Sequence, residues 1–481
     1  AVCLSWALGG FGCLLSAFSY MELSARIPVT GSVYAFAYHA LGEVFAVIGA
    51  ACITLEYGLS ASAVAANWGD KFRTLVAALG APHFASRFLV RLGPLTVSAP
   101  ALVLLLVVTA LIALGGGIGK GFSRGCSALA VALILAMSTV AFTGFEASHF
   151  EPFVPPELGG GGVLAGSVTT FFGFLGYDEV CCLAGEARDP RRSVPLSVLG
   201  TIAIATFLPV FGSVALVGLV PYGEIDSSAG FEVAFRQKGW TLLAHAVSVG
   251  ELLVLFVVTY MCFLAQPRVF YALAQDGHLP SSFLQVDGRG SPRFATWATG
   301  VLLILCGALL PFDALANAIS GGVLVAFTLV NCCVIVLRLE DGGGVAGEHG
   351  RRSLGLTLGA FSFFSALAAF LARRASSAGT VIGATLSALV AMAALVAMAM
   401  RRCRSGAAHR DASEVFFQVP WVPWLPALAI VFNGVMLASL EPRDFALLVA
   451  YLFAVLAPYF IAVACRRRRG VCPGRNEVPC E

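Results

Sequence analysis

The sequence predicts an all-α, polytopic membrane protein, and three observations support this fold class. Of the 481 residues, 58% are hydrophobic and only 12% are charged, whereas soluble domains carry about 25% charged residues. The mean hydropathy is +0.88. Apolar runs of about 20 residues, the length that crosses a bilayer as a helix, recur along the whole chain.

About 13 membrane spans are predicted, and no soluble domain fits between them, because the longest loops, 66–97 and 266–293, have about 30 residues each. The predicted spans cover residues 2–20, 33–64, 98–115, 125–145, 162–184, 194–221, 240–265, 294–311, 313–337, 354–372, 378–400, 421–440 and 444–465.

The distribution of Lys and Arg predicts the orientation of these spans. If the end of the first span is cytoplasmic and the spans alternate, about two thirds of the 30 Lys and Arg residues lie in cytoplasmic segments, as the positive-inside rule requires. The loop 66–97 fits least well, because it places positive charges outside. We therefore expect a cytoplasmic C-terminus, with Arg466–Arg469 at the membrane surface. We also expect residue 1 outside, preceded by at least one further span.

The composition argues against several other classes of protein. The net charge of +3 is spread over the loops and does not indicate a nucleic-acid partner. The 14 Cys lie mostly in apolar runs without a Cys-x-x-Cys pair, and the His residues are scattered, so we expect no metal site. Gly159–Gly162 lacks the Lys of a phosphate loop. No cofactor is therefore expected.

The segment Thr169–Pro195 carries the strongest functional signal. Gly173 and Gly176 interrupt an apolar run. Asp178 and Glu179 then follow at what should still be membrane depth. A broken helix with carboxylates is costly in lipid and persists only where it lines a protein-walled or watery cavity. Because discontinuous helices form the mid-membrane substrate sites of secondary transporters, this segment predicts such a site.

Five motifs occur in order along nearly the whole chain: YMELSARIPVTGSVYAFAYHALGEVFA, ITLEYGLSASAVAANW, FFGFLGYDEVCCLAGEARDPRRSVPLSV, PRVFYALAQDGHLP and FFQVPWVPWLPALAIVFNGVM. Together they resemble the cationic amino-acid transporter family of the amino acid–polyamine–organocation (APC) superfamily. The resemblance implies an inverted five-helix-repeat transporter fold, here without the family's first helix, followed by four C-terminal helices. That missing helix and the missing initiator Met favour a fragment over a degenerate relative.

The resemblance also implies a division of the chain. Residues 1–145 would form the first repeat without its first helix, and residues 146–338 the second repeat, which starts with the broken helix. Residues 339–465 would form the four C-terminal helices, and residues 466–481 a cytoplasmic basic tail.

The function implied is secondary transport of amino acids, with cationic ones such as arginine or lysine expected first, by alternating access. The partners would be the amino-acid substrate and the lipid bilayer, and the location a plasma membrane or, alternatively, a vacuolar or lysosomal-type membrane. Two alternatives remain: a neutral or broad amino-acid permease, and a non-transporting amino-acid sensor. An enzyme is not expected, because the loops hold no nucleophile–base pair.

The candidate substrate-binding residues centre on the break. The resemblance makes Phe172 an aromatic gate and the stretch Gly173–Gly176, with Phe174, the unwound segment; packing of a Gly kink is the structural alternative. Asp178 and Glu179 follow about 100° apart on a helix, and either could pair with a substrate cation or with an Arg of the protein. Glu56 is an intramembrane carboxylate and therefore a further candidate; a buried carboxylate bonded to a neighbouring helix is the structural alternative.

Five other residues are expected to form gates or to have structural roles. Glu22 and Arg26 are spaced i,i+4 and predict an ion pair at the cytoplasmic end of a helix. Glu186 and Arg188, in the loop after the broken helix, are given an inner-gate or structural role by the resemblance. Glu251 either faces the transport pathway or lies at the extracellular membrane edge.

Overall fold

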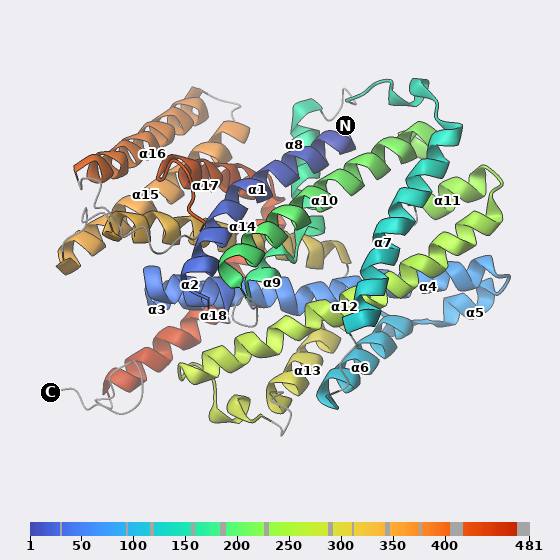
Figure 1. The fold of residues 1–481 in the computed structure, drawn as a ribbon, viewed down its shortest axis with the longest axis horizontal. Helices are drawn as coiled ribbons and strands as arrows, with labels where there is room; N and C mark the ends of the chain where they lie inside the picture. The colour runs from blue at the N-terminus through green and yellow to red at the C-terminus, as the bar shows by residue number, and fades with distance from the viewer. Residues whose placement is uncertain are drawn as a thin grey trace. The chain divides into compact units, whose positions relative to one another are not determined.

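The computed structural model is a helical protein (Figure 1), in which residues 89–98 contribute two short paired strands. It describes residues 1–28, 31–92, 95–115, 120–154, 159–182, 189–225, 230–286, 292–309, 312–341, 347–374, 378–404 and 417–468. Within these ranges, nine helices are long and apolar enough to cross a membrane, and three shorter helices are also apolar. The predicted all-α, polytopic fold class is confirmed.

Contacts divide the chain into two compact units: residues 1–7, 54–166 and 204–319 form the first, and residues 8–53, 167–203 and 320–481 the second. Each unit draws on both predicted repeats, whose boundaries stay a prediction. The elements that lie wholly in the first unit are η1 (Thr54–Leu59), α4 (Ser60–Ala78), α5 (Pro82–Arg87), β1 (Leu89–Leu92), β2 (Leu95–Ser98), α6 (Ala99–Ala113), α7 (Lys120–Ala141), η2 (Phe142–Gly144), η3 (Ala147–Phe150), η6 (Tyr222–Glu224), α11 (Gly230–Gln237), α12 (Thr241–Gln275), η7 (Ser281–Leu284) and α13 (Arg293–Leu309).

The second unit holds α2 (Ser32–Ala40), α3 (Glu43–Ile53), η4 (Phe172–Phe174), α9 (Tyr177–Cys182), α15 (Gly347–Arg373), α16 (Ala378–Arg404), α17 (Trp424–Leu437) and α18 (Pro442–Arg468). Four further helices run from one unit into the other: α1 (Val2–Arg26), α8 (Gly159–Phe171), α10 (Pro190–Leu219) and α14 (Phe312–Asp341).

Each predicted span falls on a helix. The span 33–64 begins correctly, at α2, but it is divided after Ala40 and its second part ends at Ala78 instead of residue 64. Helix α2 stops at Ala40 because Gly42 adopts a φ of +100° and its N–H, like that of Leu41, bonds back to the Ala37 carbonyl. Glycine commonly ends helices in this way, because it has no Cβ to strain the left-handed conformation. A second helix then runs without interruption from Glu43 to Ala78.

The first unit is centred on helices α4 and α12, which pack together with α6 and α13. Their core is lined by small and aliphatic residues of α4 and α6, by aromatic residues of α12 and by one leucine of α13. These residues are Ala61, Ala65, Leu104, Leu105, Val108, Ile112, Tyr260, Phe263 and Leu303. The Ser62 hydroxyl donates to the Leu303 carbonyl at 2.8 Å. Small residues therefore let α4 approach its neighbours closely, as is usual between membrane helices.

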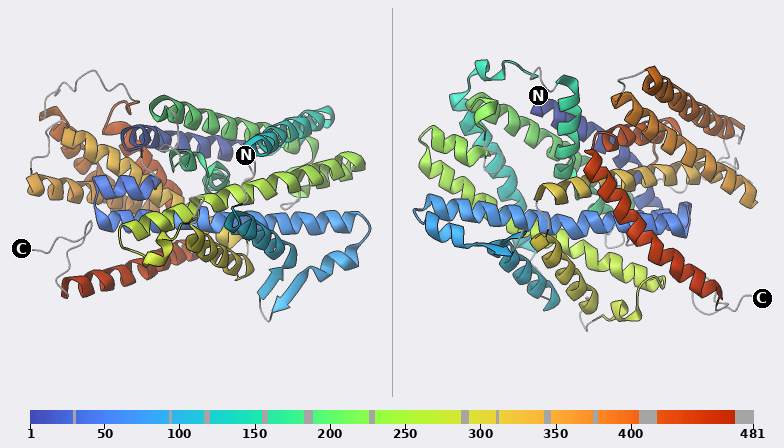
Figure 2. Two further views of the ribbon diagram at one scale, coloured as in Figure 1. Left: turned by 60° about the horizontal axis from the view of Figure 1, so that its bottom comes forward. Right: turned by 180° about the vertical axis from the view of Figure 1, so that it is seen from behind.

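The predicted loop 66–97 is partly ordered secondary structure. Helix α4 extends into it, and β1 pairs antiparallel with β2, with Leu89 opposite Ser98. Figure 2 shows this hairpin between α5 and α6. The consecutive residues Leu89-Val90 and Thr96-Val97 include β-branched side chains, which favour strands. The search for apolar runs of about 20 residues could not detect strands this short.

The second unit has its main core between α14, α15, α16 and α17. Helices α15, α16 and α17 lie side by side (Figure 1). Their shared core contains Ile335, Val336, Leu339, Leu354, Leu358, Phe361, Met398, Ala427 and Ile430. Three of the predicted C-terminal helices, α15, α16 and α17, thus pack into the second unit around α14, whereas α18 contacts α3.

Buried polar side chains join α1 to α14 and α17. The Asn331 side chain accepts a hydrogen bond from Ser19 at 2.7 Å and donates one to the Ser16 hydroxyl at 3.1 Å. The Asn433 amide of α17 donates to the same Ser16 oxygen at 3.4 Å. Such interhelical bonds are worth roughly 0.6 kcal/mol each on average in membranes. They favour one register of α1 relative to α14 and α17.

A substitution at Gly12 tests how closely α1 packs against α17. A Cβ at Gly12 would lie 1.9 Å from the Phe432 ring, so Gly12→Ala forces the ring or the helix to move. We expect a loss of about 1–3 kcal/mol in the free energy of unfolding, measured by denaturation of the detergent-solubilised protein. Gly200→Ala on α10 is the control, because its Cβ would meet open space. Equal stability of the two variants would contradict the contact.

Candidate functional site

The predicted break in the helix is present and covers Phe172–Gly176. Helix α8 ends at Phe171, one 3-10 turn follows, and α9 begins at Tyr177. Leu175 has a ψ of 144° and Gly176 a φ of +104°, so neither continues the helix. Because side chains with a Cβ rarely adopt that φ, Gly176 is the residue that lets the chain leave one helix and begin the next.

Three aromatic rings hold the start of α9. The Tyr177 ring lies 5.6 Å from Tyr20 of α1 and 5.3 Å from Phe327 of α14, between ring centroids. Tyr20 and Phe327 are themselves 5.4 Å apart. Phe171, at the end of α8, lies 5.8 Å from the same Phe327 ring. Both ends of the break are therefore fixed on Phe327, by pairs worth about 0.5–1.5 kcal/mol each beyond their burial.

The residues of the 3-10 turn differ in accessibility. Phe174 is only 3% exposed, and a Cβ at Gly9 of α1 would lie 3.1 Å from its ring. Phe174 therefore packs into the small space that Gly9 leaves. Gly173 is exposed and Phe172 is half-buried. Leu175 and Gly176 are half-buried as well. All residues of the break except Phe174 could therefore meet a ligand, whereas Phe174 supports the turn from behind.

Asp178 and Glu179 occupy the first turn of α9. Asp178 is fully buried and Glu179 is partly exposed, as residues about 100° apart on a helix should be. Helix α9 packs against α2. The first turn favours carboxylates, because the helix N-terminus carries a partial positive charge. This interaction offsets part of the free-energy cost of placing two acidic groups in a membrane span.

Glu56 belongs to the first unit and lies on the π-helical turn η1. It is only 1% exposed. The Gln266 amide of α12, itself fully buried, donates to the Thr54 hydroxyl of the same turn at 3.1 Å. Single π turns often mark functional sites, because they change the direction of side chains within a helix. This setting supports Glu56 as a candidate, although the sequence pattern did not predict the turn.

Glu251 forms an ion pair within the first unit. Its carboxylate lies 2.5 Å from Lys71 Nζ of α4, and both side chains are mostly buried. One helical turn before Lys71, the Trp68 indole donates to the Leu252 carbonyl at 2.9 Å. These contacts clamp α4 to α12. They favour a structural role for Glu251 over a place in the transport pathway.

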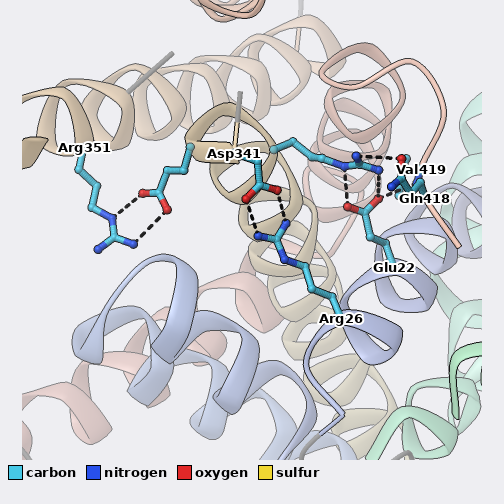
Figure 3. A network of polar contacts seen from close by, with 8 residues as sticks. Glu22, Arg26, Asp341, Arg351, Gln418 and Val419 are labelled. Atoms are coloured by element: carbon cyan, nitrogen blue, oxygen red, sulfur yellow. Dashed lines mark hydrogen bonds and ion pairs between the residues drawn. The ribbon is translucent and has the colours of Figure 1, made fainter. Parts of the chain in front are cut away.

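Glu22 and Arg26 do not pair with each other, contrary to the sequence-based expectation. Glu22 faces Arg338 of α14, with 2.6 Å between Oε1 and Nε, and also accepts from the Val419 N–H at 2.6 Å (Figure 3). Arg26 instead makes two hydrogen bonds to Asp341, at 2.8 and 2.9 Å. Spacing predicts a pair within one helix, but α14 presents an oppositely charged partner to each residue.

The network around Glu22 is the most buried of these charge clusters. Glu22 is 1% exposed and Arg338 is 16% exposed, whereas Arg351, which pairs with Glu340, is 54% exposed. Arg338 also donates to Gln418 at 3.1 Å. The segment before α17 is thus bound through both Gln418 and Val419 to the end of α1 and α14, as Figure 3 shows.

Glu22→Gln tests the energetic weight of this network. The substitution leaves the largely buried Arg338 without a counter-charge, which typically costs about 3–5 kcal/mol. Glu340→Gln is the control, because its pair with Arg351 is more exposed and should contribute less than about 1 kcal/mol. Thermal unfolding of the solubilised variants measures both. Similar shifts in the two would show that burial of the Glu22 carboxylate does not set its contribution.

Comparison with known proteins decides the family. A family model described as amino acid permease matches residues 1–396, and one for the C-terminus of such permeases matches residues 417–466. The chain belongs to the amino acid permease family. It is therefore a transporter of the APC superfamily and not an enzyme.

The relatives of this permease have several substrates in their names. It is 31% identical over 342 residues to the methylthioribose transporter of Bacillus subtilis, which covers 70% of the chain and 74% of the relative. It is 30% identical over 347 residues to the branched-chain amino acid permease of the same species, with the same coverage. The human cationic amino acid transporter 4 is 27% identical over 520 residues, covering 96% of the chain and 81% of the relative.

A solved structure supports the fold of the permease. The crystal structure of MhsT in complex with L-phenylalanine matches with a TM-score of 0.50 and 14% sequence identity, covering 84% of this chain and 91% of that chain. At this identity the match establishes the fold only. The resemblance to a broken-helix transporter seen in the sequence is therefore supported by the fold, whereas the substrate is not decided.

Sequence reasoning missed several residues that position the site. Tyr20, Phe327, Arg338 and Asp341 lie on α1 and α14 and contact the break or the charged residues of α1. Tyr20 and Phe327 lie in apolar helices and gave no functional signal in the sequence. Arg338 and Asp341 could be recognised only as charges in or near the membrane. Two predicted gate residues, Glu186 and Arg188, lie outside the described residues.

Proposed function

We propose that this permease transports cationic amino acids, such as arginine or lysine, by alternating access. The observation that carries the proposal is the position of Asp178 and Glu179 directly after the break at Phe172–Gly176. A carboxylate at the centre of a membrane helix costs about 2.5–3.5 kcal/mol on insertion scales, so it needs a function or a partner. A cationic side chain of the substrate supplies such a partner.

The backbone of the break would bind the part that all amino acids share. Where a helix ends, its last carbonyls and first N–H groups lack intrahelical partners. The carbonyls can accept from the substrate ammonium group, and N–H groups can face its carboxylate. In this proposal, Gly173 and Gly176 provide backbone contacts, Phe172 covers them as a gate, and Asp178 or Glu179 selects a positively charged side chain. Glu56 is proposed as an additional acidic contact.

A neutral amino-acid permease is the second candidate. The relatives named for methylthioribose and branched-chain amino acids are as similar in sequence as the cationic transporters. For such substrates, the carboxylates would serve the fold or the gate. The two candidates therefore differ in whether Asp178 distinguishes cationic from neutral substrates.

The ion network at the end of α1 suits an inner gate or clamp. Glu22 and Arg26 hold α1 on α14. We propose that these contacts keep the ends of the two helices together during part of the transport cycle. We also propose a plasma-membrane location, by resemblance to the family, and a cytoplasmic C-terminus. The excess of Lys and Arg in the segments assigned to the cytoplasmic side supports this orientation.

Asp178→Asn is the decisive variant for substrate charge. If Asp178 contacts a substrate cation, its loss removes a charge-assisted hydrogen bond worth about 1.5–3 kcal/mol, or roughly ten- to a hundredfold in affinity. Arginine or lysine uptake should therefore weaken more than uptake of a neutral amino acid. Glu179→Gln is the companion variant, with a smaller expected effect. Competition uptake in reconstituted vesicles, with equal amounts of each variant, measures the ratio.

The pattern of loss separates the two candidate functions. An equal loss for cationic and neutral substrates in Asp178→Asn would mean that Asp178 maintains the fold or the gate. A wild-type protein that carries only neutral amino acids would reject the cationic assignment outright.

Phe172→Ala should impair all substrates to a similar extent. A gate acts on the backbone that amino acids share, so its loss does not discriminate between side chains. Phe174→Ala is the matched variant, because Phe174 is buried against Gly9 and should act through stability. Uptake normalised to folded protein separates the two. Selective loss of one substrate class in Phe172→Ala would assign Phe172 to side-chain recognition.

A further inference from the structure

A cavity of about 270 Å³ lies within the second unit, between the α2–α3 junction, α14 and α15. It is separate from the break at Phe172–Gly176, none of whose residues line it. Its wall is mostly apolar, with Leu329, Val336 and Leu358, and also includes Thr328, Cys332 and Ser362. No residue of this wall is used by the proposed transport function.

Two glycines of α15 open the cavity. Gly355 and Gly359 are one helical turn apart, both line the cavity, and a Cβ at either would meet nothing within 4 Å. A close approach between helices does not explain these glycines, because no neighbour approaches them. The missing side chains leave space beside α15, and this space is part of the cavity.

Polar and aromatic side chains gather at one side of the cavity. Arg351 stands one turn before Gly355 on α15, and His39 lies at the end of α2 beside the exposed rings of Tyr38 and Phe45. Arg351 also pairs with Glu340 of α14, on the side shown in Figure 3. On α15 the lining runs from Arg351 through Gly355, Leu358 and Gly359 to Ser362. The cavity thus combines a mostly apolar surface with two basic residues, His39 and Arg351. A ligand that fits this combination has an apolar chain and an anionic head.

We propose that this cavity binds one acyl chain of a membrane phospholipid, with the phosphate near His39 and Arg351. Its volume is close to the lower limit of the ~300–1,000 Å³ of small-molecule sites, so it admits one chain and not a whole lipid. A helix of another protein, about 10–12 Å wide, does not fit. A free amino acid would leave its charges against the apolar wall, which is unfavourable.

The site would make the α15 contact with the α2–α3 junction depend on lipid. A chain that fills the cavity touches α14, α15 and Leu41, which packs on the core of these helices. Anything that binds only the folded protein stabilises it. All lining residues of the cavity belong to the second unit, and none of them is a proposed substrate contact. Lipid binding there does not depend on which substrate is transported.

The test uses Gly359→Leu, which fills the cavity, against Gly200→Leu on α10. Both glycines have open space at Cβ, so the two substitutions gain similar helix propensity. Delipidated full-length protein is titrated with dioleoylphosphatidylglycerol, and bound lipid is counted by native mass spectrometry with thermal unfolding in parallel. We expect wild type and Gly200→Leu to retain one phospholipid that Gly359→Leu binds at least about tenfold more weakly, with loss of the lipid-dependent thermal shift.

Dioleoylglycerol, which has the same chains but no phosphate, tests the head-group contact and should bind more weakly than the phospholipid. Equal binding of the two lipids would overturn the role of His39 and Arg351. Unchanged phospholipid binding in Gly359→Leu would overturn the site. A dimer that dissociates in Gly359→Leu, without any change in bound lipid, would assign the cavity to a second copy of the chain and also reject the proposal.

Discussion

The interruption of a helix inside a membrane is the constraint on which the second unit depends. Lipid offers no hydrogen-bond partners, so an interrupted helix must be held by protein on every side that lipid could reach. The chain meets this need with aromatic rings. Phe327 of α14 contacts both Phe171 before the break and Tyr177 after it, and Tyr20 of α1 completes the cluster. The break is thus fixed at both ends by one residue of a neighbouring helix.

The same two helices, α1 and α14, also carry the buried charges. Tyr20 is two residues before Glu22 on α1, and Phe327 lies on the helix that carries Arg338 and Asp341. Any displacement of α1 along α14 would therefore change the aromatic cluster and the ion pairs together. This arrangement links the position of the break to the end of the helices, which is the kind of coupling that alternating access requires.

The C-terminal helices are part of this assembly. Asn433 and Phe432 of α17 contact Ser16 and Gly12 of α1, and the Val419 N–H donates to Glu22. A segment far from the break in the sequence thus holds the helix that supports it. The cavity beside Gly355 and Gly359 lies in the same unit, so lipid bound there would act on α15 and α14 and not on the break directly.

The sequence by itself determined the class of fold, most of the helical spans and the position of the break. Apolar runs of fixed length report spans, because the bilayer has a fixed thickness. Gly176 reported the break, because a φ of +104° requires glycine. These signals are local, so one sequence is enough to read them. The sequence also shows which helices carry charged residues, but it does not show which oppositely charged residues they contact.

Only the tertiary structure decided which side chains meet. Spacing on one helix paired Glu22 with Arg26, yet α14 supplies Arg338 and Asp341 instead, because packing brings residues more than 300 positions away into contact. The π turn at Glu56, the burial of Phe174 against Gly9 and the ion pair of Glu251 with Lys71 are likewise properties of helix packing. Sequence periodicity gives the face of a helix, but the neighbour of that face depends on how the whole chain packs.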